Sequence, residues 1–289
     1  FEDPRVIVMS AYLQLFRLKI ALMVSASAAM GYLLAAGKGS AAPWLSLSGV
    51  FFLSSGASVL NQIQERGRDA LMERTRLRPL PAGRISAAGA WTAAVVLIGL
   101  GLTILGFASF WAAVCGVAAL VWYNGVYTHL KRSTPFAAVP GALVGALPPV
   151  IGWILGGGGA FDRQIGAIAL FFFIWQVPHF WLFLVNNGPD YERAGLPALT
   201  STFSRAQLKR ITFIWMLATA VCCLLLPLFG SADSTAVRLG LICAGGRLIW
   251  TGAAMLRREA LYLMAPLSFK EINRYAMVVM ALIALDTLF

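Results

Sequence analysis

Three side chains that carry oxygen ligands recur four residues apart near the end of a long apolar stretch. They are Asn61, Glu65 and Asp69. On an α-helix, residues four apart lie on the same face, so these three would form one polar stripe. Magnesium in proteins is held by one or two carboxylates together with phosphate oxygens and water. The spacing therefore predicts a site for a magnesium ion that carries a phosphate group.

Arginines surround this stripe and continue beyond it. The planar guanidinium group binds phosphate through two parallel hydrogen bonds, so it suits the same ligand. The alternative is a basic loop that only fixes the orientation of neighbouring membrane helices. We favour phosphate binding because carboxylates at helical spacing precede the basic residues. The arginines are Arg66, Arg68, Arg74, Arg76, Arg78 and Arg84.

A second polar cluster, Asn186 or Asn187 with Asp190, follows a later apolar stretch. A magnesium-bound diphosphate held between the two clusters would be a good leaving group, because its developing charge is neutralised. If the departing group left an allylic isoprenoid cation, aromatic faces below the clusters could stabilise that cation. The candidate aromatic side chains are Phe172, Phe173, Trp175, Phe180 and Trp181.

The apolar composition indicates that helices within a membrane position both clusters. The chain has 289 residues, of which 59% are hydrophobic and 12% are charged, and its mean hydropathy is +0.77. These values are typical of a polytopic membrane protein, and isolated strands cannot satisfy their backbone groups in lipid. Nine stretches are long and apolar enough to span: residues 18–37, 44–64, 88–107, 110–129, 136–156, 164–186, 209–229, 236–256 and 273–289.

We therefore predict one all-α integral-membrane domain over residues 1–289, a single bundle of nine transmembrane helices. The two polar clusters are separated by four helices, which predicts two related four-helix halves plus one further helix, with the clusters facing each other. Gly141 and Gly145 predict close helix packing, and Pro148-Pro149 predicts a kink. The four cysteines lie in apolar stretches, and we interpret them as small buried residues.

The basic residues fix the orientation of this bundle. Nearly all of them fall in segments on one side of the membrane, while Lys38, Arg163 and Arg238 fall on the other and Arg247 falls inside the eighth helix. The positive-inside rule then places the N-terminus and both acidic clusters in the cytoplasm, for a bacterial-type inner membrane. The net charge of +11 reflects this placement. No nucleic-acid-binding motif accompanies it, so we expect no nucleic-acid partner.

Four ordered motifs between about residues 15 and 200 resemble the UbiA-type intramembrane prenyltransferases. The tail of the first is similar to the protoheme IX farnesyltransferase (heme O synthase) branch of that family. The motifs are Asn61-xxx-Glu65-xxx-Asp69-xx-Met72-x-Arg74-Thr75-xx-Arg78-Pro79-Leu80; Tyr127-Thr128-x-Leu130-Lys131-Arg132-x-Thr134 followed by Gly145-Ala146-x-Pro148-Pro149-x-Ile151-Gly152-Trp153; Trp175-x-x-Pro178-His179-Phe180-Trp181; and Asp190-Tyr191-x-x-Ala194-Gly195-x-Pro197.

The resemblance implies a reaction and its ligands. Farnesyl diphosphate would be held with Mg²⁺, and a vinyl group of heme b would accept the farnesyl group. Heme O and diphosphate would be the products, and a heme A synthase would take heme O further. Membrane lipid would surround the bundle.

The resemblance also assigns residues to this chemistry. Magnesium and catalysis would fall to Asn61, Glu65, Asp69 and Asp190, with Tyr191 beside them. Phosphate oxygens or a heme propionate would be bound by Arg74, Arg78, Lys131 and Arg132. The remaining substrate contacts would come from Tyr127, His179 and Asn186, with His179 a candidate ligand of heme iron or a base.

Two positions depart from the family pattern, which usually has aspartate where this chain has Glu65 and Gly67. Fewer carboxylates predict weaker Mg²⁺ binding. They leave open prenyl transfer to another acceptor, a 4-hydroxybenzoate-like aromatic or another tetrapyrrole. A membrane transporter is the alternative of another class, with Arg247 as an intramembrane charge. Transporters place their sites near the bilayer midplane, whereas these charges gather at one face. His129 is expected to be structural or interfacial.

Overall fold

The computed structural model describes residues 4–37, 44–257 and 261–288, and every regular element within these ranges is helical. The first part of the chain forms α1 (Pro4–Phe16), α2 (Leu18–Ala36), α3 (Trp44–Asp69), α4 (Ala87–Ala108), α5 (Phe110–Leu120), the π-helix η1 (Val121–Tyr127) and α6 (Thr128–Leu130). The middle forms the 3₁₀-helix η2 (Pro135–Ala137), α7 (Ala138–Gly141), α8 (Leu143–Leu155), α9 (Arg163–Asn186), α10 (Gly188–Arg193) and α11 (Leu199–Thr202). The last part forms α12 (Arg205–Leu225), the 3₁₀-helix η3 (Leu226–Phe229), α13 (Thr235–Arg257) and α14 (Leu261–Leu288).

Seven helical stretches within the described residues are long and apolar enough to cross a membrane. They are Leu18–Ala36, Ala87–Ala108, Phe110–Leu130, Pro135–Leu155, Arg163–Asn186, Arg205–Phe229 and Thr235–Arg257. The all-α membrane architecture is confirmed. The ranges predicted around α3 and α14 are also helical, yet neither helix is among the seven, so the nine-helix count stays a prediction. Lys38 and Phe289 lie outside the described residues.

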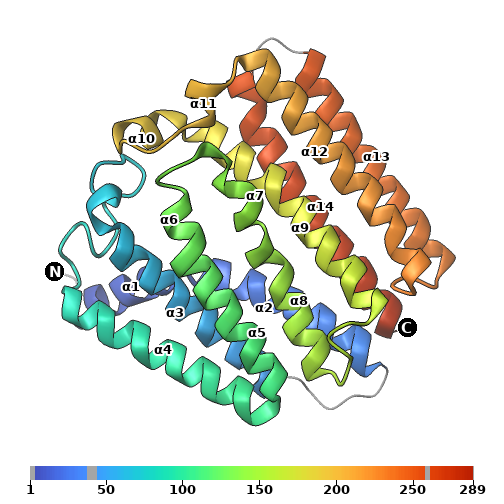
Figure 1. The fold of residues 1–289 in the computed structure, drawn as a ribbon, viewed down its shortest axis with the longest axis horizontal. Helices are drawn as coiled ribbons and strands as arrows, with labels where there is room; N and C mark the ends of the chain where they lie inside the picture. Colours follow the sequence, from blue (N-terminus) through green and yellow to red (C-terminus); the bar gives the residue numbers. More distant parts are fainter. Residues whose placement is uncertain (1–3, 38–43, 258–260, 289) are drawn as a thin grey trace.

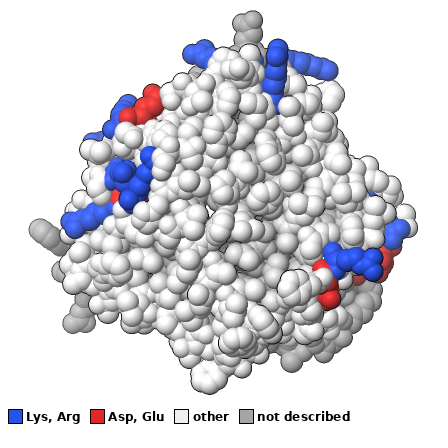
Figure 2. Space-filling model, viewed as in Figure 1, with Lys and Arg blue, Asp and Glu red and all other residues white. Residues whose placement is uncertain are grey.

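Most of the long helices run side by side, from the upper left to the lower right of Figure 1. In the same view, Figure 2 shows charged side chains gathered at the upper left, the top and the lower right, with a broad uncharged face between. Charges at the helix ends and an apolar belt between them are what a bilayer requires, since a charge in hydrocarbon is costly.

Close packing around α2 and α8 holds the two sides of the bundle together. α2 packs on α3 and α8, and α14 packs on α2, α9 and α13. A Cβ atom at Gly152 of α8 would lie 1.8 Å from the carbonyl oxygen of Ala28 in α2, so only glycine permits this crossing. The close packing predicted at Gly141 and Gly145 is confirmed, since a Cβ atom there would meet Tyr127 at 2.4 Å and Gln176 at 2.3 Å. The helix breaks at Ala142, before the Pro148-Pro149 pair.

Candidate active site

The polar stripe predicted on α3 lies inside the protein. Asn61, Glu65 and Asp69 are only 2%, 6% and 2% exposed. The amide nitrogen Nδ2 of Asn61 donates to Oγ1 of Thr128 in α6 at 3.0 Å. Buried polar groups require such partners, because water cannot replace them. The stripe is therefore fixed against the segment from η1 to α6, which carries Tyr127 and leads directly into Lys131 and Arg132.

Glu65 forms a buried ion pair with Lys131. The side chains of Lys131 and Glu65 are 13% and 8% exposed, and the ammonium group lies 5.5 Å from the ring centroid of Tyr127. Burial lowers the pKa of Lys131, although Glu65 and Asp69 act in the opposite direction. The second carboxylate oxygen of Glu65, Oε1, is buried and has no hydrogen-bond partner among the described residues. This oxygen is available to a cation.

Asp69 is held by the loop that follows α3. Its Oδ2 accepts from the guanidinium of Arg78 at 2.7 Å, and its backbone carbonyl accepts from the hydroxyl of Thr75 at 2.8 Å. Burial is the largest cause that lowers the pKa of Arg78; the charge of Arg17 adds to it, and Asp69 opposes it. The loop thus folds back and places one cation on the last acid of the stripe.

Asp190 of α10 joins the second cluster to the same loop. Its Oδ1 accepts from the backbone N–H of Glu73 and its Oδ2 from that of Arg74, both at 3.2 Å. Arg193 lies 3.4 Å from Oδ1. These bonds explain why the loop after α3 lies beside α10 at the upper left of Figure 1. The two clusters therefore meet through the backbone of residues 73 and 74, 116 or more positions before Asp190 in sequence.

Aromatic rings form the wall next to these charges. Tyr127 stacks on Tyr123 at 5.9 Å and on Phe180 at 5.5 Å between ring centroids. His179 lies between Trp175 at 4.9 Å and Phe269 at 5.0 Å, and its Nδ1 is 2.8 Å from Oδ1 of Asn273. This asparagine contact was not predictable, because Asn273 is 94 residues away.

The other predicted contacts lie at the same end. The guanidinium of Arg74 covers the ring of Phe183 at 4.9 Å. Arg132 donates to the carbonyl of Gln64 at 3.1 Å. Burial raises the pKa of Tyr191 to about 12, so its hydroxyl keeps a proton to donate. Asn186 has a buried Oδ1 with no partner in the described part of the chain.

Comparison with known proteins assigns the chain to a family. Residues 23–262 match the UbiA prenyltransferase family. The chain belongs to this family. A protoheme IX farnesyltransferase from Geobacter sulfurreducens is 46% identical over 218 residues, which are 75% of this chain and 81% of the relative. A protein of the same name from Oleidesulfovibrio alaskensis is 38% identical over 276 residues, 95% of each chain.

Solved structures of UbiA proteins share the fold. A digeranylgeranylglyceryl phosphate synthase superposes with a TM-score of 0.79 at 17% identity, covering 97% of this chain and 98% of the other. A UbiA homolog from Archaeoglobus fulgidus, bound to GPP and Mg²⁺, superposes with a TM-score of 0.67 at 17% identity, covering 94% and 99%. At this identity the likeness concerns the fold alone.

The donor set of this UbiA protein fits a hard cation that arrives with a phosphate. Within the described ranges, no three His, Cys, Asp or Glu side chains gather into a ready metal site. However, three buried carboxylate or amide oxygens have no hydrogen-bond partner among the described residues: Glu65 Oε1, Asn124 Oδ1 and Asn186 Oδ1. Carboxylate and amide oxygens are the ligands that Mg²⁺ prefers, and its remaining positions are commonly filled by phosphate and water.

Sequence reasoning did not single out Asn124, Gln64 or Arg17. Asn124 sits in the π-helix η1, and its Nδ2 donates to the carbonyl of Ala57 at 3.0 Å. Gln64 donates to the backbone carbonyl of Asn124 at 3.1 Å. An amide inside an apolar stretch was the available signal, and π-helices often mark functional sites. Arg17 has φ 51° and ψ 51°, a left-handed conformation that is uncommon for residues other than glycine. No sequence pattern predicted this conformation.

Proposed function

We propose that this protein transfers the farnesyl group of farnesyl diphosphate to heme b and so makes heme O. One observation supports the transfer chemistry: the arginine-rich loop after α3 binds both acidic clusters. Arg78 of this loop donates to Asp69, and the loop backbone donates to Asp190. We infer heme as the acceptor from the names of relatives. These are called protoheme IX farnesyltransferase, and one of them is 38% identical over 95% of this chain. Those names favour heme over a 4-hydroxybenzoate-like acceptor.

In this proposal, Asn61, Glu65, Asp69 and Asp190 hold Mg²⁺ and the diphosphate. Bound magnesium would neutralise negative charge that develops on the leaving diphosphate. The carboxylates now paired with Lys131 and Arg78 would turn to the cation, and these two basic side chains would turn to phosphate oxygens. Such an exchange keeps every buried charge compensated, which buried ions require. Arg74, Arg132 and the protonated hydroxyl of Tyr191 supply further donors.

The proposed transfer breaks one C–O bond and forms one C–C bond. The C–O bond of farnesyl diphosphate breaks and its electron pair leaves with the diphosphate. The allylic carbon bonds to the terminal carbon of a heme vinyl group, and water adds to the neighbouring carbon and releases a proton. Cation–π attraction from the stack of Tyr123, Tyr127 and Phe180 would stabilise the allylic cation. His179 and Asn186 would contact the substrates.

The setting of this reaction is also proposed. The whole chain would form one domain whose nine crossing helices include α3 and α14, in a bacterial-type inner membrane. The N-terminus and the acidic clusters would face the cytoplasm. Heme O would pass to a heme A synthase.

The test is incubation of the purified protein with Mg²⁺, farnesyl diphosphate and heme b, followed by mass spectrometry of the porphyrins. A hydroxyethylfarnesyl heme is expected. Asp69→Asn should lower its rate by roughly 100-fold or more, because one aimed charge at the leaving group is lost. Prenylation of another acceptor but never of heme would overturn the heme assignment, and full activity of Asp69→Asn would overturn the diphosphate site.

A further inference from the structure

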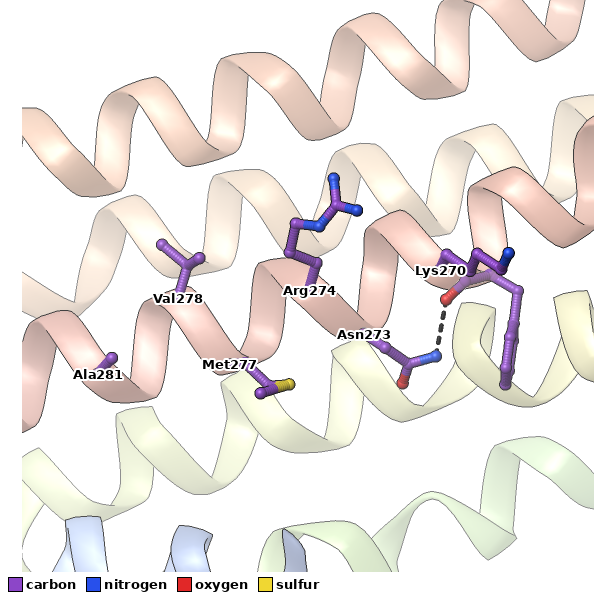
Figure 3. A pocket seen from close by; sticks show the side chains of 7 residues that line it. Lys270, Asn273, Arg274, Met277, Val278 and Ala281 are labelled. Atoms are coloured by element: carbon purple, nitrogen blue, oxygen red, sulfur yellow. Dashed lines mark hydrogen bonds between the residues drawn. The ribbon is translucent and has the colours of Figure 1, made fainter.

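Asn273 of α14 holds the half-buried ring of His179 of α9 in one orientation. Its Oδ1 lies 2.8 Å from Nδ1 of His179, and its Nδ2 donates to the backbone carbonyl of Phe269 at 2.7 Å. The dashed line in Figure 3 marks this second bond. Because a carbonyl oxygen only accepts hydrogen bonds, the NH₂ group of Asn273 must face Phe269, and the amide oxygen must face His179.

This orientation of the amide fixes the tautomer of His179. An amide oxygen accepts and never donates, so Nδ1 of the neutral imidazole must carry the proton at this contact. The other ring nitrogen, Nε2, then keeps its lone pair and can accept a proton. Asn273 is uncharged, so it orients the ring without adding a charge beside it.

Aromatic rings beside His179 suit the protonated form of the same imidazole. The ring centroids of Trp175 and Phe269 lie 4.9 and 5.0 Å from that of His179, each at an interplanar angle of 35°. A cation within about 6 Å of an aromatic face is attracted to it. Trp175 is itself held in place, because its Nε1 donates to the backbone carbonyl of Ile272 at 2.9 Å. An imidazolium formed here therefore keeps its aromatic neighbours and its bond to Asn273.

His179 lies on the apolar side of the charged groups. Phe183 follows it by four residues, about 6 Å along the axis of α9, and the guanidinium of Arg74 covers the Phe183 ring at 4.9 Å. Phe180, whose ring centroid is 5.5 Å from that of His179, stacks on Tyr127 of the aromatic wall. A prenyl diphosphate bound at the arginine-rich loop would extend its prenyl carbons into the bundle, to the level of His179.

We propose that Asn273 is a positioning residue that sets His179 in the Nδ1–H tautomer, and that Nε2 of His179 takes up the proton released during prenyl transfer. This role rests on the proposed prenyl transfer, but it does not depend on heme as the acceptor. When a vinyl group accepts the prenyl carbon, water forms a C–O bond to the adjacent cationic carbon, and its O–H bond breaks with the electron pair staying on oxygen. When an aromatic ring accepts it, a ring C–H bond breaks and its electron pair returns to the ring. In both cases the proton goes to the Nε2 lone pair and forms the imidazolium.

The first measurement determines the tautomer without any substrate. The chain has two histidines, so ¹⁵N-histidine labelling gives signals from two imidazole rings, and His179→Gln identifies those of His179. In nanodiscs above neutral pH, the wild type should show Nδ1 protonated and Nε2 unprotonated. Asn273→Asp keeps an oxygen acceptor and should keep this tautomer, whereas Asn273→Leu removes the acceptor and should shift the population toward Nε2–H. An Nε2–H tautomer in the wild type overturns the positioning role.

The second measurement compares rates of prenyl transfer. His179→Gln should lower kcat by roughly 100-fold or more, because a general base is lost. Asn273→Leu should lower kcat by about 10-fold with KM for farnesyl diphosphate unchanged, since some rings would still hold the productive tautomer, and Asn273→Asp should restore most of the rate. Thr287→Val removes a hydroxyl near the end of the same helix and serves as the control. The unfolding temperature of each variant reports its folding.

The outcomes separate this proposal from the proposed function. If the wild type prenylates a different acceptor but never heme, the heme assignment fails, and the rate of His179→Gln relative to wild type with that acceptor tests the base. A kcat of His179→Gln equal to that of the wild type overturns the base. A six-coordinate, low-spin heme spectrum that disappears in His179→Gln also overturns it, because Nε2 would then bind iron. Absence of transfer to any acceptor overturns both.

Discussion

Each carboxylate of the candidate site is bound by a cation or by backbone N–H groups within the protein. The effect of a substitution therefore depends on which of these groups loses its acceptor. Glu65 is bound by a lysine, Asp69 by an arginine and Asp190 by two backbone amides. A longer side chain replaces the usual aspartate at Glu65, yet its carboxylate reaches Lys131 and leaves one oxygen unpaired. At Gly67, the other departure, no atom lies within 4 Å of where a Cβ would stand, so nothing packs in place of the missing acid.

The Glu65–Lys131 pair should control stability as well as activity. Lys131→Gln leaves a buried carboxylate without its cation, and we expect a loss of about 3–5 kcal/mol in unfolding free energy. Glu65→Gln/Lys131→Gln removes both charges and should be more stable than either single variant. Thermal unfolding of the three variants in one detergent measures this. Additive losses in the double variant would show that the two groups do not interact.

Tyr191 should act as a proton donor that does not titrate in the working range. Burial raises its pKa to about 12, above its ordinary value, so the hydroxyl stays protonated between pH 6 and 9. Tyr191→Phe removes the donor, and we expect kcat/KM for farnesyl diphosphate to fall by roughly 10-fold, the loss expected for one hydrogen bond to a charged group. The ratio of wild type to variant should stay constant over this pH range. A ratio that changes around neutral pH would contradict this assignment.

At the scale of elements, the loop of residues 70–86 connects both halves of the site. Most helix ranges followed from the sequence because apolar length is a local property, but α1 was not predicted, and α14 begins at Leu261 where the prediction began at residue 273. The π-helix η1 could not be predicted from the sequence, since one extra residue per turn leaves no periodic signal. The hydrogen-bond partners of Glu65, Asp190 and His179 could not be predicted either. Each partner lies 66 or more residues away in the sequence, and its position depends on how the helices pack.

Asp190 should order this loop even when no substrate is bound. In Asp190→Asn one side-chain acceptor becomes an NH₂ group, so one of the bonds from Glu73 and Arg74 is lost and the other loses its charge. We expect about 1–3 kcal/mol less protection of these amides, measured by hydrogen exchange without Mg²⁺ or substrate. Arg76→Gln alters an exposed residue of the same loop and serves as the control. If exchange at residues 73 and 74 is unchanged, Asp190 acts only through its ligands.

At the scale of the whole molecule, the number of crossings decides which ends share a side of the membrane. If α3 and α14 cross along with the seven apolar stretches, the loop after α3 is cytoplasmic and the end of α14 is on the opposite side. If α3 does not cross, the loop moves to the side opposite the N-terminus. The candidate ligands lie at the polar end of α3, so the crossing of this helix also decides which side of the membrane they face.

Single cysteines can locate these segments in intact cells. Leu77, Phe161 and Leu288 are exposed, so each accepts a cysteine without disturbing the core, in a background with the four native cysteines changed to serine. An impermeant maleimide should label Phe161→Cys and Leu288→Cys from outside, and label Leu77→Cys only after the membrane is opened. Labelling of Leu77→Cys in intact cells would mean that α3 does not cross. The acids would then face away from the cytoplasm, where a soluble supply of diphosphate substrate could not reach them.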